Sequence, residues 1–201
     1  MKVVVITGGI GSGKSEACRF IESEYGWPVY SADDRVKELY RDSPTLLESI
    51  EDALGTRFRD AEGNFKPSEL ASVIFSDTTA LEKTEALVFP ELLADFEQWK
   101  IQHKDSSHVI LESATILEKP QLKCIGDCTI LIDAPLHLRS ARAVQRDRAE
   151  IGEIHKRISN QKLMNAVSQK FLIPDVDYII CNDSSMDDFR NNLIKVVDII
   201  A

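Results

Sequence analysis

The sequence predicts an α/β protein in which a three-layer fold is built on one five-stranded parallel sheet, within a single domain over residues 1–201. Short, β-branched apolar runs alternate with longer segments of helical periodicity, which is the pattern of a parallel sheet covered by helices. These runs contain few polar residues, as expected of strands buried on both faces. The first run leads through a glycine-rich turn directly into a helical segment, which favours a ligand-binding α/β fold.

The first strand is expected over residues 1–7 and the first helix over about 14–24, ended by Gly26. The turn between them, Gly8–Ser15, reads G-x-x-x-x-G-K-S in the strand-loop-helix context of a phosphate-binding loop. Backbone N–H groups of such a loop surround a di- or triphosphate, and the dipole of the following helix adds positive potential. The predicted phosphate-binding residues are Gly9, Ile10, Gly11, Ser12, Gly13, Lys14 and Ser15.

The side chains at the end of this loop define its chemistry. Lys14 supplies a cation for the β- and γ-phosphates, and the Ser15 hydroxyl suits Mg²⁺. A dinucleotide-binding G-x-G-x-x-G loop is excluded, because Lys14 and Glu16 stand where that pattern requires its last glycine.

The other elements follow from periodicity and from helix-start and helix-stop residues. Strands are expected at residues 28–30, 108–111, 128–132 and 178–181. Helices are expected at about 33–41, from 44, from 67, over 79–102 with an interruption at Pro90, over 136–168 with a break at Gly152, and over 186–200. Residues of about 35–102 therefore form a helical block inserted between strands.

Composition excludes several classes of function. The formal net charge of −9 disfavours general nucleic-acid binding, so positive side chains near the loop must hold an anionic ligand. No run of eighteen apolar residues predicts a membrane span. The four cysteines lack the spacing of a zinc site and are expected to be buried thiols of a cytoplasmic protein.

Asp33 follows the second expected strand, at the edge of the sheet where α/β folds bind ligands. A carboxylate in that position can accept the proton of a hydroxyl that attacks the γ-phosphate. A helix-capping aspartate is common at such a position, and the spacing leaves both interpretations open. Asp34 is expected to be a solvated neighbour.

Arg139, Arg142 and Arg146 recur at the spacing of one helix face in the segment after Asp133-Ala134-Pro135. Three guanidinium groups on one face could bind the phosphates of a nucleotide and neutralise charge in a transition state. A salt-bridged surface with Asp147 and Glu150 explains the same spacing, so both remain open. Glu112 and Glu118, after the third strand, are candidate carboxylates for Mg²⁺ or substrate. The four histidines show no metal-ligand spacing and are expected at the surface or at strand ends.

These motifs together resemble the dephospho-coenzyme A kinase family over nearly the full length of the chain. The matching segments are Ile6–Ser15, Pro28–Asp33, Glu112–Glu118, Asp133–Pro135, Arg142, Arg146–Asp147, Arg157–Gln161 and Asp177–Asn182.

The resemblance implies a P-loop kinase fold similar to nucleoside monophosphate kinases. It implies that ATP and Mg²⁺ bind at the loop, that the helical block accepts dephospho-coenzyme A, and that a lid covers about residues 136–168. The implied reaction is transfer of the γ-phosphate of ATP to the ribose 3′-hydroxyl of dephospho-coenzyme A, the last step of coenzyme A biosynthesis. Asp33 then matches the base, Arg142 a lid arginine, and Asn182 a residue near the adenine, while Arg146 belongs to the same lid segment.

The chain departs from the family pattern at several positions. Ser31 stands where the family has the first aspartate of D-x-D, and Phe89 stands where a histidine is usual. The loop between Gln161 and Asp177 is longer than usual, and Ser184 stands where glycine is common. A kinase for another small hydroxyl substrate, or a non-catalytic nucleotide-binding relative, remains an alternative. A GTP switch protein is disfavoured because no N-K-x-D guanine motif is found.

Overall fold

The structure is a computed structural model that describes residues 1–122, 125–161 and 175–201. It consists of two compact units. Unit 1 comprises Met1–Ser31 and His103–Ala201, and unit 2 comprises Ala32–Gln102. Unit 1 contains the sheet, whereas unit 2 is helical.

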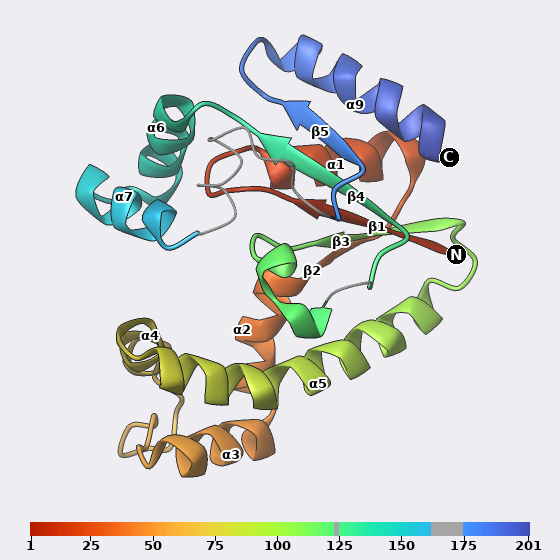
Figure 1. Cartoon of the computed structure of the whole chain (residues 1–201). Coiled ribbons are helices and arrows are strands. Elements are labelled where there is room, and N and C mark those ends of the chain that lie inside the picture. The colour runs from red at the N-terminus through yellow and green to blue at the C-terminus, as the bar shows by residue number, and fades with distance from the viewer. Residues whose placement is uncertain (123–124, 162–174) are drawn as a thin grey trace. The chain divides into compact units, whose positions relative to one another are not determined.

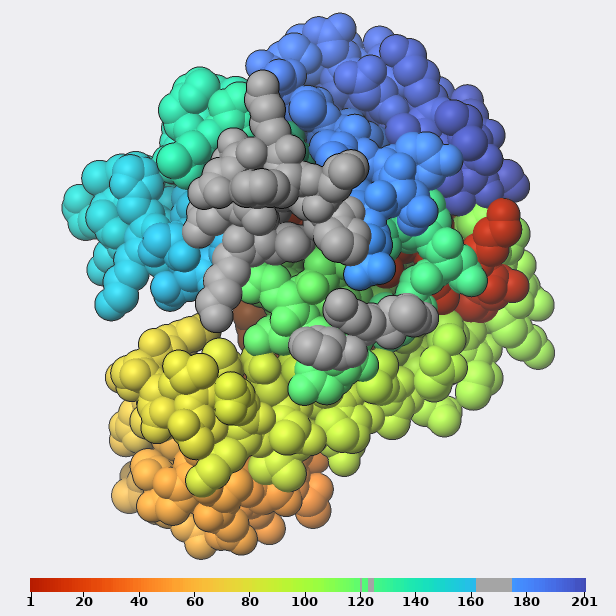
Figure 2. Space-filling model, viewed as in Figure 1, coloured from red at the N-terminus to blue at the C-terminus, as the bar shows by residue number. Residues whose placement is uncertain are grey.

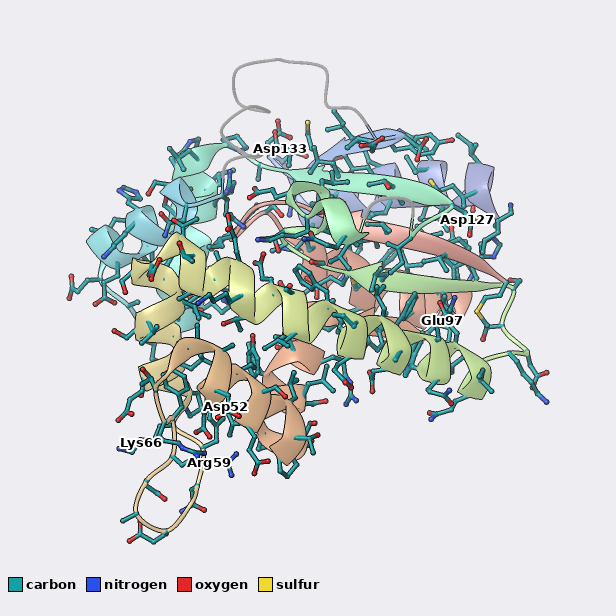
Figure 3. All side chains as sticks on the ribbon, turned by 60° about the horizontal axis from the view of Figure 1, so that its bottom comes forward. Asp52, Arg59, Lys66, Glu97, Asp127 and Asp133 are labelled. Atoms are coloured by element: carbon teal, nitrogen blue, oxygen red, sulfur yellow. The ribbon has the colours of Figure 1, made fainter. Side chains whose placement is uncertain are left out.

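The sheet of unit 1 confirms the predicted five parallel strands, in the order β2-β3-β1-β4-β5. The strands are β1 (Lys2–Thr7), β2 (Val29–Ser31), β3 (His108–Glu112), β4 (Cys128–Asp133) and β5 (Tyr178–Cys181). Figure 3 labels Asp127, which directly precedes β4, and Asp133, which is its last residue. Because all the strands are parallel, their carboxyl ends lie along one edge of the sheet. The glycine-rich turn that follows β1 begins at this edge.

Helices α1 (Lys14–Tyr25) and α9 (Met186–Ile200) cover the same face of this sheet (Figure 1). Apolar residues of both helices pack onto the alternate residues of β1 and β4 that point toward them, with Ala17 and Ile21 fully buried. Gly26 ends α1 in the left-handed conformation, which glycine adopts at little steric cost. The remaining elements of unit 1 are α6 (Leu136–Asp147), α7 (Ile151–Ser159) and the 3₁₀ turns η1 (Ile116–Glu118) and η2 (Pro120–Leu122).

The core beneath α9 supports a stability prediction. Phe189 is fully buried, and its ring lies 3.9 Å from the position that a β-carbon on Gly13 would occupy. Replacement of Phe189 with Ala should lower the free energy of unfolding by about 3–5 kcal/mol, because it leaves a large cavity in the core. Urea denaturation followed by circular dichroism measures this change, with Asn191→Ala on the exposed side of α9 as the control. Equal losses in the two variants would contradict the packing role of Phe189.

Unit 2 consists of α2 (Ala32–Asp42), α3 (Pro44–Leu54), α4 (Pro67–Ser76) and α5 (Thr78–Gln102), whose surfaces are visible in orange to light green in Figure 2. Its core is apolar, and it is made by Leu46, Leu47, Ile50, Phe58, Leu70 and Val88. Helix α3 begins as predicted, with Pro44 in its first turn and the Ser43 hydroxyl accepting a hydrogen bond from the N–H of Leu46 at 3.3 Å.

A buried carboxylate fixes the loop between α3 and α4. Glu51 is 2% exposed, accepts a hydrogen bond from the N–H of Phe58 at 2.8 Å, and pairs with Arg57 and Arg59. The N–H of Phe58 and these two guanidinium groups lower the pKa of Glu51 against the opposing effect of its burial. Figure 3 labels Arg59 and Lys66, which lie in this loop.

Two predicted helix boundaries are wrong. Helix α5 continues through Pro90. Because proline has no N–H, the carbonyl of Ala86 loses its helical partner, but both residues are exposed and this carbonyl can bond to water instead. Burial of Val88, Phe89 and Leu92 on one side of the helix outweighs that loss. The second break falls at Arg148, where φ is 50°, and not at Gly152, which lies inside α7.

Other predictions fall partly or wholly outside the description. Residues 162–168 of the expected helix lie outside the described residues, as does most of the longer loop between Gln161 and Asp177. In the described part of the chain, no helix is long and apolar enough to cross a membrane. The expectation of buried thiols is wrong for Cys181, which is exposed, and right for Cys18.

Candidate nucleotide-binding site

The glycine-rich turn connects β1 to α1 with the backbone of a phosphate-binding loop. Gly8, Gly11 and Gly13 have φ values of 148°, 75° and 108°, a region that favours glycine. Gly13 precedes the first residue of α1, and its carbonyl accepts hydrogen bonds from the N–H groups of Glu16 and Ala17 at 3.1 and 3.0 Å. The loop therefore ends at the positive end of the α1 dipole.

Surrounding elements approach two glycines of the loop so closely that a side chain at either position would not fit. A β-carbon on Gly8 would lie 2.2 Å from the carbonyl oxygen of Ile132 in β4. A β-carbon on Gly13 would lie 2.2 Å from Nδ2 of Asn182, which follows β5. The tertiary structure thus fixes the loop on the side away from a ligand.

Lys14 and Ser15 lie at the start of α1 as the motif predicts. The Lys14 side chain is buried, and its Nζ lies 3.5 Å from the carbonyl oxygen of Gly9, so it extends back along the loop. Ser15 is exposed, which leaves its hydroxyl accessible to a ligand. These positions fit a lysine that contacts phosphates and a serine that contacts a nucleotide-bound cation.

Glu112 lies at the carboxyl end of β3, beside Ile6 of β1 in the parallel register. Its carboxylate accepts a hydrogen bond from the Ser31 hydroxyl at 3.0 Å and is 8% exposed. Ser31, which departs from the family pattern, therefore has a hydrogen-bond partner in Glu112. An aspartate at that position would face the Glu112 carboxylate with a like charge.

Arg142 and Asn182 meet at the loop, although 40 residues separate them in the sequence. Arg142 donates to the carbonyl oxygen of Asn182 at 3.1 Å and to its Oδ1 at 3.3 Å. Nδ2 of Asn182 in turn donates to the carbonyl oxygen of Ser12 at 2.9 Å. Asn182 is 4% exposed, so this side chain connects α6 to the phosphate loop.

Arg139 and Gln161 contact the loop on the same side. Nε of Arg139 donates to the carbonyl oxygen of Ile10 at 3.0 Å, and the N–H of Ile10 donates to Oε1 of Gln161 at 2.8 Å. Both side chains are buried. The backbone of Ile10 therefore has both its polar groups bound by side chains.

Arg146 belongs to a salt-bridged surface, which is the other interpretation that the spacing left open. It binds both carboxylate oxygens of Asp147, at 2.6 and 3.0 Å, and Arg157 of α7 binds the same carboxylate at 2.6 Å. These hydrogen bonds lower the pKa of Asp147 to about 2, and the largest effect is that of Arg146. The three predicted arginines thus divide: Arg139 and Arg142 contact the loop and its neighbour, whereas Arg146 joins an exposed charge cluster.

Asp33 belongs to the first turn of α2, because the helix begins at Ala32. The N-cap interpretation is therefore wrong, and both Asp33 and Asp34 lie where the helix dipole favours negative charge. Asp33 is half-buried, whereas Asp34 is exposed and accepts a hydrogen bond from Lys37 at 2.7 Å. Asp33 follows the last residue of β2 by two positions in the chain.

A pocket of about 440 Å³ opens at the carboxyl ends of β4 and β5. Its walls come from α6 and α7 and from the residues on either side of Asn182. The lining residues are Asp133, Ala134, Pro135, Leu136, Arg139, His155, Ile158, Ser159, Cys181 and Asp183. The volume lies in the range of small-molecule sites.

The sequence reasoning missed two contacts of the site. Gln161 lies in a matching segment, but the sequence predicts no role for it. Helical spacing makes Arg139 one of three equivalent arginines. Spacing along the chain could not separate them, because the loop that Arg139 contacts lies 129 residues away.

Among the described residues, no group of three or more His, Cys, Asp or Glu side chains is arranged to hold a metal ion.

Comparisons with known proteins identify relatives over most of the chain. A model of the dephospho-CoA kinase family matches residues 2–188. A dephospho-CoA kinase of Bacteroides fragilis is 32% identical over 179 residues, covering 89% of this chain and 83% of the relative. A dephospho-CoA kinase of Chlorobaculum tepidum is 31% identical over 199 residues, covering 96% and 92%.

Solved structures share the fold. A protein of Thermus thermophilus superposes with a TM-score of 0.81 at 24% identity, covering 100% of this chain and 98% of the other. A dephospho-CoA kinase of Campylobacter jejuni gives a TM-score of 0.67 at 24% identity, covering 98% and 96%. A shikimate kinase of Acinetobacter baumannii gives 0.52 at 15% identity, covering 100% and 93%. These likenesses establish the P-loop kinase fold.

Proposed function

This chain belongs to the dephospho-CoA kinase family, and we propose that it transfers the γ-phosphate of ATP to the 3′-hydroxyl of dephospho-coenzyme A, giving coenzyme A and ADP. The loop is the observation that carries the ATP part of this proposal, and the family match carries the acceptor. Its glycines take the required φ values, Lys14 is drawn in beside Gly9, and Ser15 faces solvent at the start of α1. That arrangement suits the triphosphate of a nucleotide.

In the proposed reaction, the 3′-hydroxyl oxygen forms a bond to the γ-phosphorus while the bond from that phosphorus to the β–γ bridging oxygen breaks. ADP leaves with the electron pair of the broken bond. Lys14 and the loop N–H groups stabilise the charge that develops on the phosphate oxygens. The hydroxyl proton passes to the carboxylate of Asp33.

Asp33 is proposed as the base because of its carboxylate chemistry and its place in the chain. It follows β2, whose last residue, Ser31, is in register with Glu112 on the ligand-binding edge of the sheet. A half-buried carboxylate can accept a proton from a bound hydroxyl, whereas exposed Asp34 is paired with Lys37. The family resemblance at Pro28–Asp33 supports the same assignment.

Mg²⁺ is proposed as the cation that accompanies ATP. It would neutralise charge on the β- and γ-phosphates, whose oxygens would hold it together with waters and an oxygen of this chain. Ser15 would supply that oxygen, because its hydroxyl is exposed at the end of the loop. Oxygen ligands of this kind suit a hard cation.

The adenosine part of ATP is assigned to the pocket beside β4 and β5. Cys181 and Asp183 line it, and Asn182 between them is bound to the loop through Ser12. Arg142, held by Asn182, would therefore lie between the pocket and the loop, which supports its assignment to nucleotide binding. Arg146 would contribute to nucleotide binding only after its hydrogen bonds to Asp147 break.

A lid over about residues 136–168 and acceptance of dephospho-coenzyme A by the helical residues of about 35–102 complete the proposal. Contacts of Arg139 fix the first turns of α6 to the loop. Movement of a lid would therefore involve the junction at Arg148, where the chain turns between α6 and α7.

The acceptor is tested by following ADP release, with ATP and Mg²⁺, in the presence of dephospho-coenzyme A and of a panel of nucleosides, shikimate and sugars. We expect turnover with dephospho-coenzyme A well above that with every panel member, and a product phosphorylated at the 3′-hydroxyl by NMR. Turnover with a panel member alone would assign a different acceptor. Binding of ATP without turnover of any acceptor would indicate a non-catalytic relative.

A further inference from the structure

Arg139 is a buried cation in contact with the phosphate loop. Its side chain is 4% exposed, and Nε donates to the carbonyl oxygen of Ile10 at 3.0 Å. Nη2 lies 3.5 Å from Oε1 of Gln161 and only 2.0 Å from the position that a β-carbon on Gly9 would take. The guanidinium group thus lies directly against the backbone of Gly9 and Ile10.

The hydrogen-bond partners of this guanidinium are neutral. In residues 1–122, 125–161 and 175–201, its bonds go to a carbonyl and an amide oxygen, and to no carboxylate. Burial lowers the pKa of Arg139, and the negative charge of Asp133 opposes this effect without cancelling it. A buried guanidinium that lacks a carboxylate partner is unfavourable, because hydrogen bonds to neutral oxygens only partly replace its hydration.

Arg139 also explains a glycine that backbone geometry alone does not require. Gly9 lacks the positive φ of Gly8, Gly11 and Gly13, so another residue could adopt its backbone conformation. Its position is one of the unspecified places in G-x-x-x-x-G-K-S. The side chain of any other residue would collide with the Arg139 guanidinium. Gly9 and Arg139 therefore form a matched pair.

We propose that Arg139 is a second cation of the phosphate loop, a positioning residue that acts from behind the loop and is neutralised by the nucleotide phosphates bound in front of it. This proposal rests on the proposed binding of ATP at the loop. Without nucleotide the charge of Arg139 is poorly compensated, and the phosphates supply the negative charge that it lacks. Arg139 thereby favours ligands according to the number of their phosphate charges.

The first experiment separates charge from hydrogen bonding and packing with three variants. Arg139→Lys retains the charge, Arg139→Gln retains only a donor, and Arg139→Met retains only apolar volume. Calorimetric titration with ATP, ADP and AMP should show near-native ATP affinity for the Lys variant and a loss of roughly 10-fold or more for the Gln and Met variants. The loss should shrink from ATP to ADP to AMP. Arg19→Met, an exposed arginine on α1, is the control and should bind all three nucleotides as the unmodified protein does.

Thermal unfolding provides a readout that a structural role would move in the opposite direction. Without nucleotide, removal of the unfavourable buried charge should offset loss of the hydrogen bond to the Ile10 carbonyl, so the Met variant should melt close to the unmodified protein. With saturating ATP it should gain less in melting temperature than the unmodified protein. A Met variant that melts well below the unmodified protein without ligand would overturn the proposal and make Arg139 a packing residue.

The second experiment tests the pairing with Gly9. Gly9→Ala should weaken ATP binding because its methyl group displaces the guanidinium, and Arg139→Met in the same chain should relieve the collision, so that the double variant binds no worse than Arg139→Met alone. Gly11→Ala is the matched control: its β-carbon would lie 2.1 Å from the backbone oxygen of Arg139, and its φ is 75°. That collision does not involve the guanidinium, so Arg139→Met should not relieve it.

The outcomes separate this proposal from the proposed function. If the unmodified protein fails to bind ATP, the proposed function fails. If it binds ATP but the Lys, Gln and Met variants have equal affinity, or lose equally for ATP and AMP, only the role of Arg139 fails. Lack of relief in the Gly9→Ala double variant would also contradict the pairing.

Discussion

Replacement of Asp33 with Asn is expected to lower kcat by roughly 10²–10⁴-fold while leaving ATP affinity nearly unchanged. An amide cannot accept the proton of the attacking hydroxyl, but it preserves the size and shape of the side chain. The first turn of α2 should therefore stay intact. Steady-state kinetics with dephospho-coenzyme A, together with calorimetric titration of ATP, measure the two effects separately.

Asp34→Asn is the matched control for this change. The two aspartates are adjacent in the same helical turn, but Asp34 is exposed and paired with Lys37. Loss of one exposed ion pair should leave kcat within a factor of about two. A variant at Asp33 that keeps most of its kcat, or one that fails through loss of ATP binding, would show that Asp33 is not the base.

Replacement of Lys14 with Met should lower kcat/KM by about 10²–10³-fold, through both weaker ATP binding and slower turnover. Lys14 is buried at the loop, so its charge acts where little water screens it. Met has similar length and keeps the apolar contacts of the side chain. Measurement of KM for ATP, kcat and the ATP dissociation constant resolves the two contributions.

Lys195→Met serves as the control because Lys195 is exposed on α9 and contacts only Asn192 among the hydrogen bonds of the described residues. It removes the same charge from the protein without touching the loop. Binding of dephospho-coenzyme A alone should survive in the Lys14 variant. Unchanged affinity for ATP after loss of Lys14 would contradict the assignment of the loop to nucleotide phosphates.

Local patterns were sufficient to predict most of the elements. The β-branched run before Gly8 and the motif that ends in Lys14-Ser15 specify strand, loop and helix over a short stretch of chain. Ser43-Pro44 likewise specifies the start of α3, because capping and the fixed φ of proline act within one turn. Such signals depend on neighbouring residues alone and do not require knowledge of packing.

The wrong boundaries arose where packing outweighed local preference. Pro90 lies within α5 because its side of the helix is exposed while Val88 and Leu92 are buried. Gly152 lies within α7 because Ile154 and Ile158 are buried against Ala143 of α6. The free energy of burying these apolar residues exceeds the cost of one missing hydrogen bond or of one flexible glycine.

By itself, the sequence predicted a phosphate-binding loop at Gly8–Ser15 and the motifs of its family, because those signals are contained in continuous segments. Only the tertiary structure decided how the arginines differ. Arg139 contacts Gly9 and Ile10, Arg142 contacts Asn182, and Arg146 pairs with Asp147. The physical reason is that the environment of a charged side chain depends on which distant backbone packs against it, and helical spacing gives all three arginines the same description.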